Sequence, residues 1–266
     1  RFNWNQWRII YNNQMKKFLL TLAIVLCGTL SFAQNTFPYS VQLTPVQIPN
    51  LPGLHSFAFG QHQGQWLLIG GRKDGIHARQ PFNAFPESEN NTTLYVVDIA
   101  TREVWSAPTT SLPTPIREQL QSTNMNFHQD GDSLYLIGGY AFSASANDHI
   151  TFDKLTALDV PKVIDAVRNG TSLTPYFKQI SNPIFQNTGG QLGKIGDSFY
   201  LVGGQVFTGR YNPMNHPTFE QTYSNSVQRF VIKETHQGLK IVHYPSFKND
   251  TLLHRRDFNV LPTIAA

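Results

Sequence analysis

One motif occurs three times along the chain and constrains its fold more than any other feature. Each copy is a turn, a short apolar run and a pair of glycines, and the copies are Gly64–Gly71, Gly131–Gly139 and Gly196–Gly204. The glycine pairs follow one another at intervals of 68 and 65 residues. Self-similarity at a fixed, long period is typical of stacked supersecondary units. The alternative, three unrelated turns that each contain two glycines, does not explain why an apolar run precedes every pair.

The first repeat predicts four strands. The inner strand covers Ser56–Phe59, the second Trp66–Ile69, the third Thr93–Asp98 and the outer one Glu103–Trp105. Turn-forming residues separate the strands. Their apolar runs are nearly continuous, as expected of strands that neighbouring sheets cover on both faces. The chain is therefore predicted to be all-β.

The glycine pairs have a predicted structural role at the ends of the second strands. A residue without Cβ permits positive φ and a close approach of backbone to backbone. Such an approach is expected where strands converge near the centre of the fold. The predicted structural repeat glycines are Gly70, Gly71, Gly138, Gly139, Gly203 and Gly204.

These features resemble the kelch family of β-propellers. In the first repeat Gly70–Gly71, Leu94–Asp98 and Trp105 follow the family's order of glycine pair, Tyr-containing strand with Asp, and late Trp. The resemblance covers roughly residues 54 to 247. It implies an all-β, kelch-like β-propeller with about three four-stranded blades, at about 54–113, 117–181 and 184–247, and the start of a fourth at 254–266.

The later repeats depart from the family pattern. The second has Tyr176 and Phe177 where a Trp is expected, and the third offers Phe230 and Tyr244 without a matching Asp. Aromatic side chains of similar bulk fill the same space between blades, so the expected fold is unchanged. A propeller usually closes with at least four blades. We therefore expect a truncated larger ring of six or seven blades.

Two further elements are predicted outside the blade pattern. Val41–Ile48 reads as the outer strand of the last blade, which would close the ring from the N-terminal side but would lack its partners in this fragment. Residues 161–170 read as a short helix, because Pro161 suits its first turn, three apolar side chains share a face, and Asn169-Gly170 ends it. Packing is the expected role of this helix.

The N-terminal region predicts export. Met15-Lys16-Lys17 precedes an apolar run of about 15 residues, with small residues before a cleavage point after Ala33. We interpret 1–14 as upstream translation, 15–33 as a signal peptide and 34–266 as the mature propeller, with no transmembrane segment after cleavage. An uncleaved anchor is the alternative. A lipoprotein at Cys27 is disfavoured by the bulky Leu26 before it.

Charge and cysteine content exclude several classes of function. The net charge of +4 comes from four basic residues within 1–33, so the mature part is neutral and a nucleic-acid partner is not expected. The chain's one cysteine, Cys27, lies in the predicted signal peptide, so the mature part has no disulfide.

A second resemblance narrows the expected source. The phrase Gly203–Pro213 and the later Gln221–Asn225 are similar to a group of exported Bacteroidetes propellers. This resemblance implies passage through an export machinery, and such proteins often end in a sorting domain for type IX secretion, which is not visible here. The expected location is the periplasm, the cell surface or the exterior.

The long connections after the glycine pairs are the predicted place for binding, because long loops on a rigid scaffold commonly carry it. Arginine forks suit carboxylates and aromatic faces suit sugar rings. One hypothesis is that arginines and aromatic residues from adjacent blades line a pocket at the propeller axis for a glycan or an acidic sugar. The alternative is that these loops pack on one another. The predicted ligand-binding residues are Arg72, His77, Arg117, Tyr140, Arg210, Tyr211, Asn212 and Arg255.

Motifs of catalysis are scarce. The sequence has no phosphate loop, nucleophile elbow or zinc-binding His-Glu-x-x-His, so no catalytic residue, metal or cofactor is predicted. Galactose oxidase chemistry on a kelch propeller requires a Tyr–Cys cross-link, which the mature chain cannot form. The prediction is a binding or scaffold module for a glycan or a protein ligand. The alternative is a carbohydrate-active enzyme resembling the kelch-type sialic acid mutarotases, with Glu118 and Arg117 as the pair to examine.

Overall fold

The computed structural model describes residues 39–75, 84–212, 218–236 and 238–261. The chain divides into two units, Arg1–Val46 and Gln47–Ala266. In the first unit the described residues are exposed and belong to no helix or strand. Val41–Ile48 forms no strand, in line with the expectation that it lacks its partners here.

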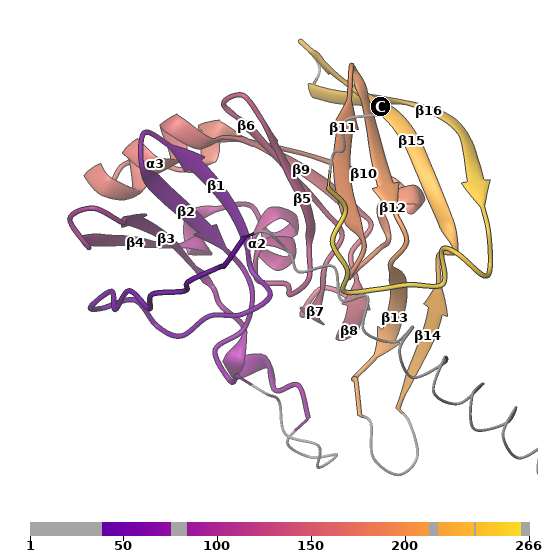
Figure 1. Cartoon of the computed structure of the whole chain (residues 1–266), viewed down its shortest axis with the longest axis horizontal. Helices are drawn as coiled ribbons and strands as arrows, with labels where there is room; N and C mark the ends of the chain where they lie inside the picture. The colour runs from indigo at the N-terminus through magenta and orange to yellow at the C-terminus, as the bar shows by residue number, and fades with distance from the viewer. Residues whose placement is uncertain (1–38, 76–83, 213–217, 237, 262–266) are drawn as a thin grey trace, which may run out of the picture. The chain divides into compact units, whose positions relative to one another are not determined.

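Three four-stranded antiparallel sheets form the body of the second unit (Figure 1). In each sheet the strands lie in the order of the chain. The first sheet contains β1 (Ala58–His62), β2 (Gln65–Ile69), β3 (Thr93–Asp98) and β4 (Val104–Pro108). The second contains β5 (Asn126–Asp130), β6 (Ser133–Ile137), β9 (Lys154–Asp159) and β10 (Phe177–Ser181). The third contains β11 (Gln191–Ile195), β12 (Ser198–Val202), β15 (Ser226–Thr235) and β16 (Gly238–Lys248).

This architecture confirms the predicted fold class. The unit is all-β and propeller-like, with one four-stranded sheet for each copy of the glycine motif. One apolar core, with Leu67 and Leu136 at its centre, lies between the first two sheets, and another, with Phe185 and Phe230, lies between the second and third. Both faces of the second sheet are therefore covered, which explains its nearly continuous apolar runs.

A fourth sheet forms from the connections that the sequence predicted only as long loops. It contains β7 (Tyr140–Ser143), β8 (Asp148–Thr151), β13 (Gln205–Gly209) and β14 (Phe219–Tyr223), in the order β14-β13-β8-β7. Two hairpins, one from the second repeat and one from the third, meet where Thr208 pairs with Ile150. The hydroxyl of Thr151 strengthens this contact, because it donates to the carbonyl of Phe207 and accepts from the N–H of Phe207.

The predicted helix is present as α3 (Val160–Asn169). A carboxylate oxygen of Asp159 accepts from the N–H of Lys162 and caps its start, and Gly170 at φ 65° ends it. Its apolar face is buried in the core between the first two sheets, so the helix has the packing role that its sequence indicates.

Shorter helices lie in the connections between strands, and the sequence did not predict them. They are α2 (Thr114–Leu120) and the 3-10 turns η1 (Glu87–Glu89), η2 (Thr109–Ser111), η3 (Thr174–Tyr176) and η4 (Pro183–Phe185). None of the helices in the described part of the chain has the length and apolar character needed to cross a membrane.

The glycine pairs place neighbouring sheets in close contact. All six glycines have positive φ. The N–H of Gly139 donates to the carbonyl of Asn187, which belongs to the next repeat, at 3.0 Å. A Cβ on Gly138 would overlap that same carbonyl oxygen. No other residue type fits here, because both the backbone angle and the space exclude a side chain.

Candidate functional site

The candidate site is a cavity where the three repeats converge, and equivalent residues build its wall. The residue directly after each glycine pair forms a backbone bridge to a residue that precedes the inner strand. The bridges join His55 to Arg72, Thr123 to Tyr140 and Thr188 to Gln205. In the described structure each bridge contains paired backbone hydrogen bonds of 2.8 to 3.1 Å.

A second set of equivalent residues links one repeat to the next. Ser56, Asn124, Gly189 and Asp257 each follow a residue of the cavity wall, and all have φ between 51° and 67°. The N–H of Asn124 donates to Ser56, that of Gly189 to Asn124, and that of Asp257 to Gly189, always at the carbonyl oxygen. We call this series the collar. Its hydrogen bonds join successive repeats to one another around the cavity.

The axial cavity has a volume of about 350 Å³. This lies within the range of roughly 300–1,000 Å³ that is usual for small-molecule sites. All its residues belong to the second unit. They are His55, Ser56, Arg72, Phe85, Thr123, Asn124, Tyr140, Thr188, Gln205, Phe207, Tyr211, Arg256 and Asp257.

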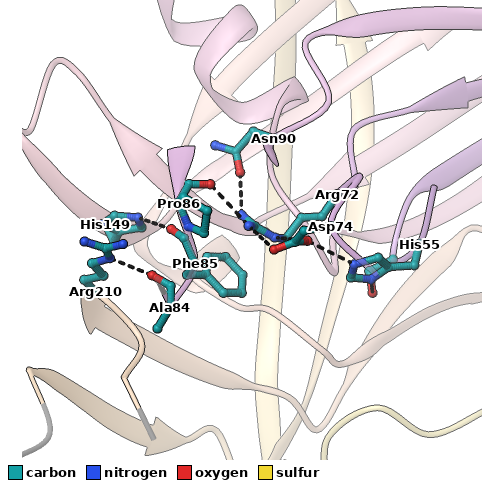
Figure 2. A network of polar contacts seen from close by, with 10 residues as sticks. His55, Arg72, Asp74, Ala84, Phe85, Pro86, Asn90, His149 and Arg210 are labelled. Atoms are coloured by element: carbon teal, nitrogen blue, oxygen red, sulfur yellow. Dashed lines mark hydrogen bonds and ion pairs between the residues drawn. The ribbon is translucent and has the colours of Figure 1, made fainter. Parts of the chain in front are cut away.

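Arg72 is 1% exposed and its guanidinium is bound on several sides (Figure 2). Nε and Nη2 donate to the two carboxylate oxygens of Asp74 at 3.0 and 2.7 Å. Nη1 donates to Oδ1 of Asn90 at 2.9 Å, and Nη2 also donates to the carbonyl of Pro86 at 3.2 Å. The guanidinium carbon lies 4.0 Å from the ring centre of Phe85. Arg72 therefore fixes the 84–90 segment beside the cavity, and Asp74 neutralises its charge.

His55 and Asp74 converge beside the cavity. Nε2 of His55 lies 3.5 Å from Oδ1 of Asp74, and Nδ1 lies 3.1 Å from the hydroxyl of Ser56. Burial raises the pKa of Asp74, but the hydrogen bonds and charge of Arg72 outweigh burial and leave the pKa below its ordinary value. Asp74 is therefore ionised at neutral pH, and Nε2 of His55 lies within ion-pair distance of its carboxylate.

An aromatic cluster forms another part of the wall. Phe85, Tyr140, Phe207 and Tyr211 lie with ring centres 5.1 to 6.2 Å apart. The hydroxyl of Tyr140 donates to the carbonyl of Gly209 and accepts from the N–H of Tyr211. Burial raises the pKa of Tyr140, so it stays protonated and serves as a fixed cross-link between the hairpins.

Other lining side chains keep polar atoms without a partner among the described residues. Oε1 of Gln205 accepts from Nη1 of Arg256 and from Nε2 of Gln221. Because arginine only donates, the atom that faces Arg256 is oxygen, and the amide nitrogen of Gln205 is left free. Gln205 is 3% exposed. The hydroxyl of Thr123 and the amide of Asn124 also lack partners within the described chain.

The predicted ligand-binding residues divide into two groups. Arg72, Tyr140 and Tyr211 line the cavity. Arg210 lies outside the lining and donates from Nε to the carbonyl of Ala84 at 2.7 Å (Figure 2). Asn212, 4% exposed, is buried nearby. His77 lies outside the described residues.

Two predicted arginines lie away from the cavity. Arg117 is on α2 and donates to the hydroxyl of Thr114 at 3.5 Å. The side chain of Arg255 is exposed and donates to the carbonyl of Leu252, while the neighbouring Arg256 lines the cavity. The carbonyl of Arg255 accepts from the N–H of Gly204 at 2.8 Å, so the backbone here is bound to the third repeat.

Glu118, examined with Arg117 as an acid–base pair, is a structural carboxylate. It accepts from the hydroxyls of Ser143 and Ser145 and from the N–H of Ser145. Burial raises its pKa, but these hydrogen bonds outweigh burial and leave the pKa below its ordinary value. Glu118 thus anchors the β7–β8 turn to α2.

Sequence reasoning missed most of the polar wall, although a signal was present. His55, Thr123 and Thr188 each lie 15 residues before the first glycine of their pair. Gln205 occupies the position after the third pair, where Arg72 and Tyr140 follow the first two. Counting fixed offsets from the glycines would have found these residues.

Comparisons with known proteins add no functional assignment. No protein-family model and no curated protein matches the chain. One solved structure, described as "Structure of YjhT", aligns with a TM-score of 0.42 and 14% identity, over 73% of this chain. The chain spans 65% of the length of that structure. A match at this level carries no argument about function. Within the described residues, no three His, Cys, Asp or Glu side chains gather as a metal site would require.

Proposed function

We propose that this protein is an exported, kelch-like propeller that binds a carbohydrate in the axial cavity. The observation that carries the proposal is the wall itself, in which three repeats combine aromatic faces with free amide and hydroxyl groups. Sugar rings stack on aromatic faces and their hydroxyls need both donors and acceptors. The signal-like segment at 15–33 supports export to a compartment where glycans are met.

A glycan array tests this proposal by comparing the binding of the unaltered protein with that of the Tyr211→Ala variant. Tyr211 contributes an aromatic face to the wall. Loss of this face should weaken sugar binding about tenfold or more, because stacking and apolar burial are both reduced. Tyr200→Ala is the matched control, since Tyr200 is partly buried on β12 and does not line the cavity. Equal binding by both variants would contradict the proposal.

A second candidate function, a carbohydrate-active enzyme, is favoured by the convergence of His55 and Asp74. In mutarotation a base removes the proton from the anomeric hydroxyl while an acid protonates the ring oxygen. The bond from the anomeric carbon to the ring oxygen breaks, and reclosure gives the other anomer. A histidine beside a carboxylate suits this proton exchange.

Anomer exchange of reducing sugars, followed by NMR, tests the enzymatic candidate. His55→Ala should slow the exchange about a hundredfold, as expected for loss of an acid–base group. His62→Ala is the control, because His62 pairs with Asp132 outside the cavity. Exchange at the uncatalysed rate with the unaltered protein would exclude this candidate and leave the binding proposal intact.

A further inference from the structure

The charges around the axial cavity cancel. Arg72 faces the carboxylate of Asp74 at 2.7 Å. Nε of Arg256 lies 3.6 Å from a carboxylate oxygen of Asp257. Among the lining residues, these two arginines therefore each have an acidic partner close by. The guanidinium of Arg72 is already bound in a buried pair, and breaking that pair would be costly. An anionic ligand that approached Arg256 would also approach the carboxylate of Asp257, so neither arginine offers an unopposed positive charge.

Three lining groups without a protein partner in the described structure are uncharged. They are the free nitrogen of Gln205, the hydroxyl of Thr123 and the amide of Asn124. Gln205 is 3% exposed and lines the cavity, and its nitrogen has no partner among the described residues, so it offers a donor to a molecule bound there. A neutral hydroxyl group satisfies such a donor without the desolvation cost that a carboxylate ligand brings.

We propose that the ligand of the axial cavity is an uncharged, hydroxyl-rich molecule such as a neutral monosaccharide, and that Gln205 and Thr123 select it. This inference rests on the proposed carbohydrate binding and narrows it. It differs from the expectation that arginines bind an acidic sugar, because Arg72 and Arg210 are bound by protein groups and Arg117 and Arg255 lie away from the cavity.

The test compares neutral methyl glycosides with glucuronic acid and sialic acid, by calorimetry on the full chain at low and high salt. Neutral glycosides should bind with an affinity that salt does not change, since no ionic contact contributes. Gln205→Glu keeps an oxygen toward Arg256 and Gln221 but removes the donor, so it should weaken neutral-sugar binding about tenfold. Gln186→Glu adds the same charge at an exposed position outside the cavity and should leave binding unchanged.

A second variant separates binding from folding. Thr123→Val deletes a hydroxyl that has no partner in the described structure, so its thermal unfolding should match the unaltered protein while neutral-sugar affinity falls several-fold. Tighter, salt-dependent binding of the acidic sugars would overturn the neutral-ligand inference and leave carbohydrate binding standing. Absence of binding by either class of sugar would overturn both proposals.

Discussion

At the scale of single residues, two arginines that were expected to bind a ligand instead stabilise the structure of a loop. Arg72 and Arg210 come from repeats far apart in sequence, yet both donate to carbonyl groups between Ala84 and Pro86. The planar guanidinium reaches several acceptors at once, which an ammonium group cannot do. The 84–90 segment is thereby fixed beside the cavity from two sides.

Substitution of Arg72 tests this structural role. Arg72→Lys keeps the charge but loses most of the fork that binds Asp74, Asn90 and Pro86. We expect the free energy of unfolding to fall by about 1–3 kcal/mol, because the buried acceptors on Asn90 and Pro86 lose their donor. Urea denaturation measures the change, and Arg102→Lys in an exposed turn should stay within about 0.5 kcal/mol. Equal stabilities of the two variants would show that the fork is dispensable.

At the scale of elements, the glycine pairs fix how one sheet meets the next. Gly138 and Gly131 both have positive φ, at 66° and 59°. A Cβ on Gly138 meets the backbone of Asn187, whereas a Cβ on Gly131 meets nothing within 4 Å. A side chain at either position is therefore destabilised by the positive φ, but only a side chain at Gly138 also clashes with a neighbouring backbone.

Alanine at each of these glycines separates the two costs. Gly131→Ala should destabilise the protein by about 1 kcal/mol, the usual effect of a left-handed backbone angle. Gly138→Ala should cost about 3 kcal/mol or more, because the second and third repeats must also move apart. Thermal unfolding of the two variants checks the difference. If the Gly138 variant were as stable as the Gly131 variant, the second and third repeats could move apart without a loss of stability, which would contradict this account.

Local sequence patterns predicted some elements and not others. Thr93–Asp98 was predicted as a strand and is β3, and the helix predicted from Pro161 begins one residue earlier. The sheet made by β8 and β13 was not predicted, since it depends on a meeting of segments that lie in different repeats. The same holds for the cavity. Arg72 and Tyr140 were predicted as binding residues because they lie in long loops, whereas the role of Gln205 depends on contacts with Arg256 and Gln221.

At the scale of the whole molecule, carboxylates tie distant parts of the chain together and make stability depend on pH. Asp74 binds the first-repeat loop through Arg72, Glu118 binds α2 to the β7–β8 turn, and Asp159 caps α3. Burial opposes ionisation of each, but hydrogen bonds and neighbouring charges outweigh it, so all three have lowered pKa values in the folded state.

Acid should therefore destabilise the protein in a defined direction. The unfolded chain holds more protons on these carboxyl groups than the folded chain does below their unfolded pKa values of about 4. Their contribution is fully present above that range and is lost as the pH falls through the folded values. Urea midpoints measured at successive pH values should decrease on acidification. A combined Asp74→Asn and Glu118→Gln variant should show a shallower decrease, and an equal slope would contradict the assignment.

The collar has a thermodynamic consequence for any ligand of the axial cavity. Its residues Ser56, Asn124, Gly189 and Asp257 lie 65 to 68 positions apart, so each repeat supplies one link and no repeat contains the cavity alone. Docking of the repeats and formation of the cavity are thus a single equilibrium. A ligand that occupies the cavity adds its binding free energy to that docking, by RT ln(1 + [L]/Kd). The free energy that holds the repeats together therefore rises with ligand concentration.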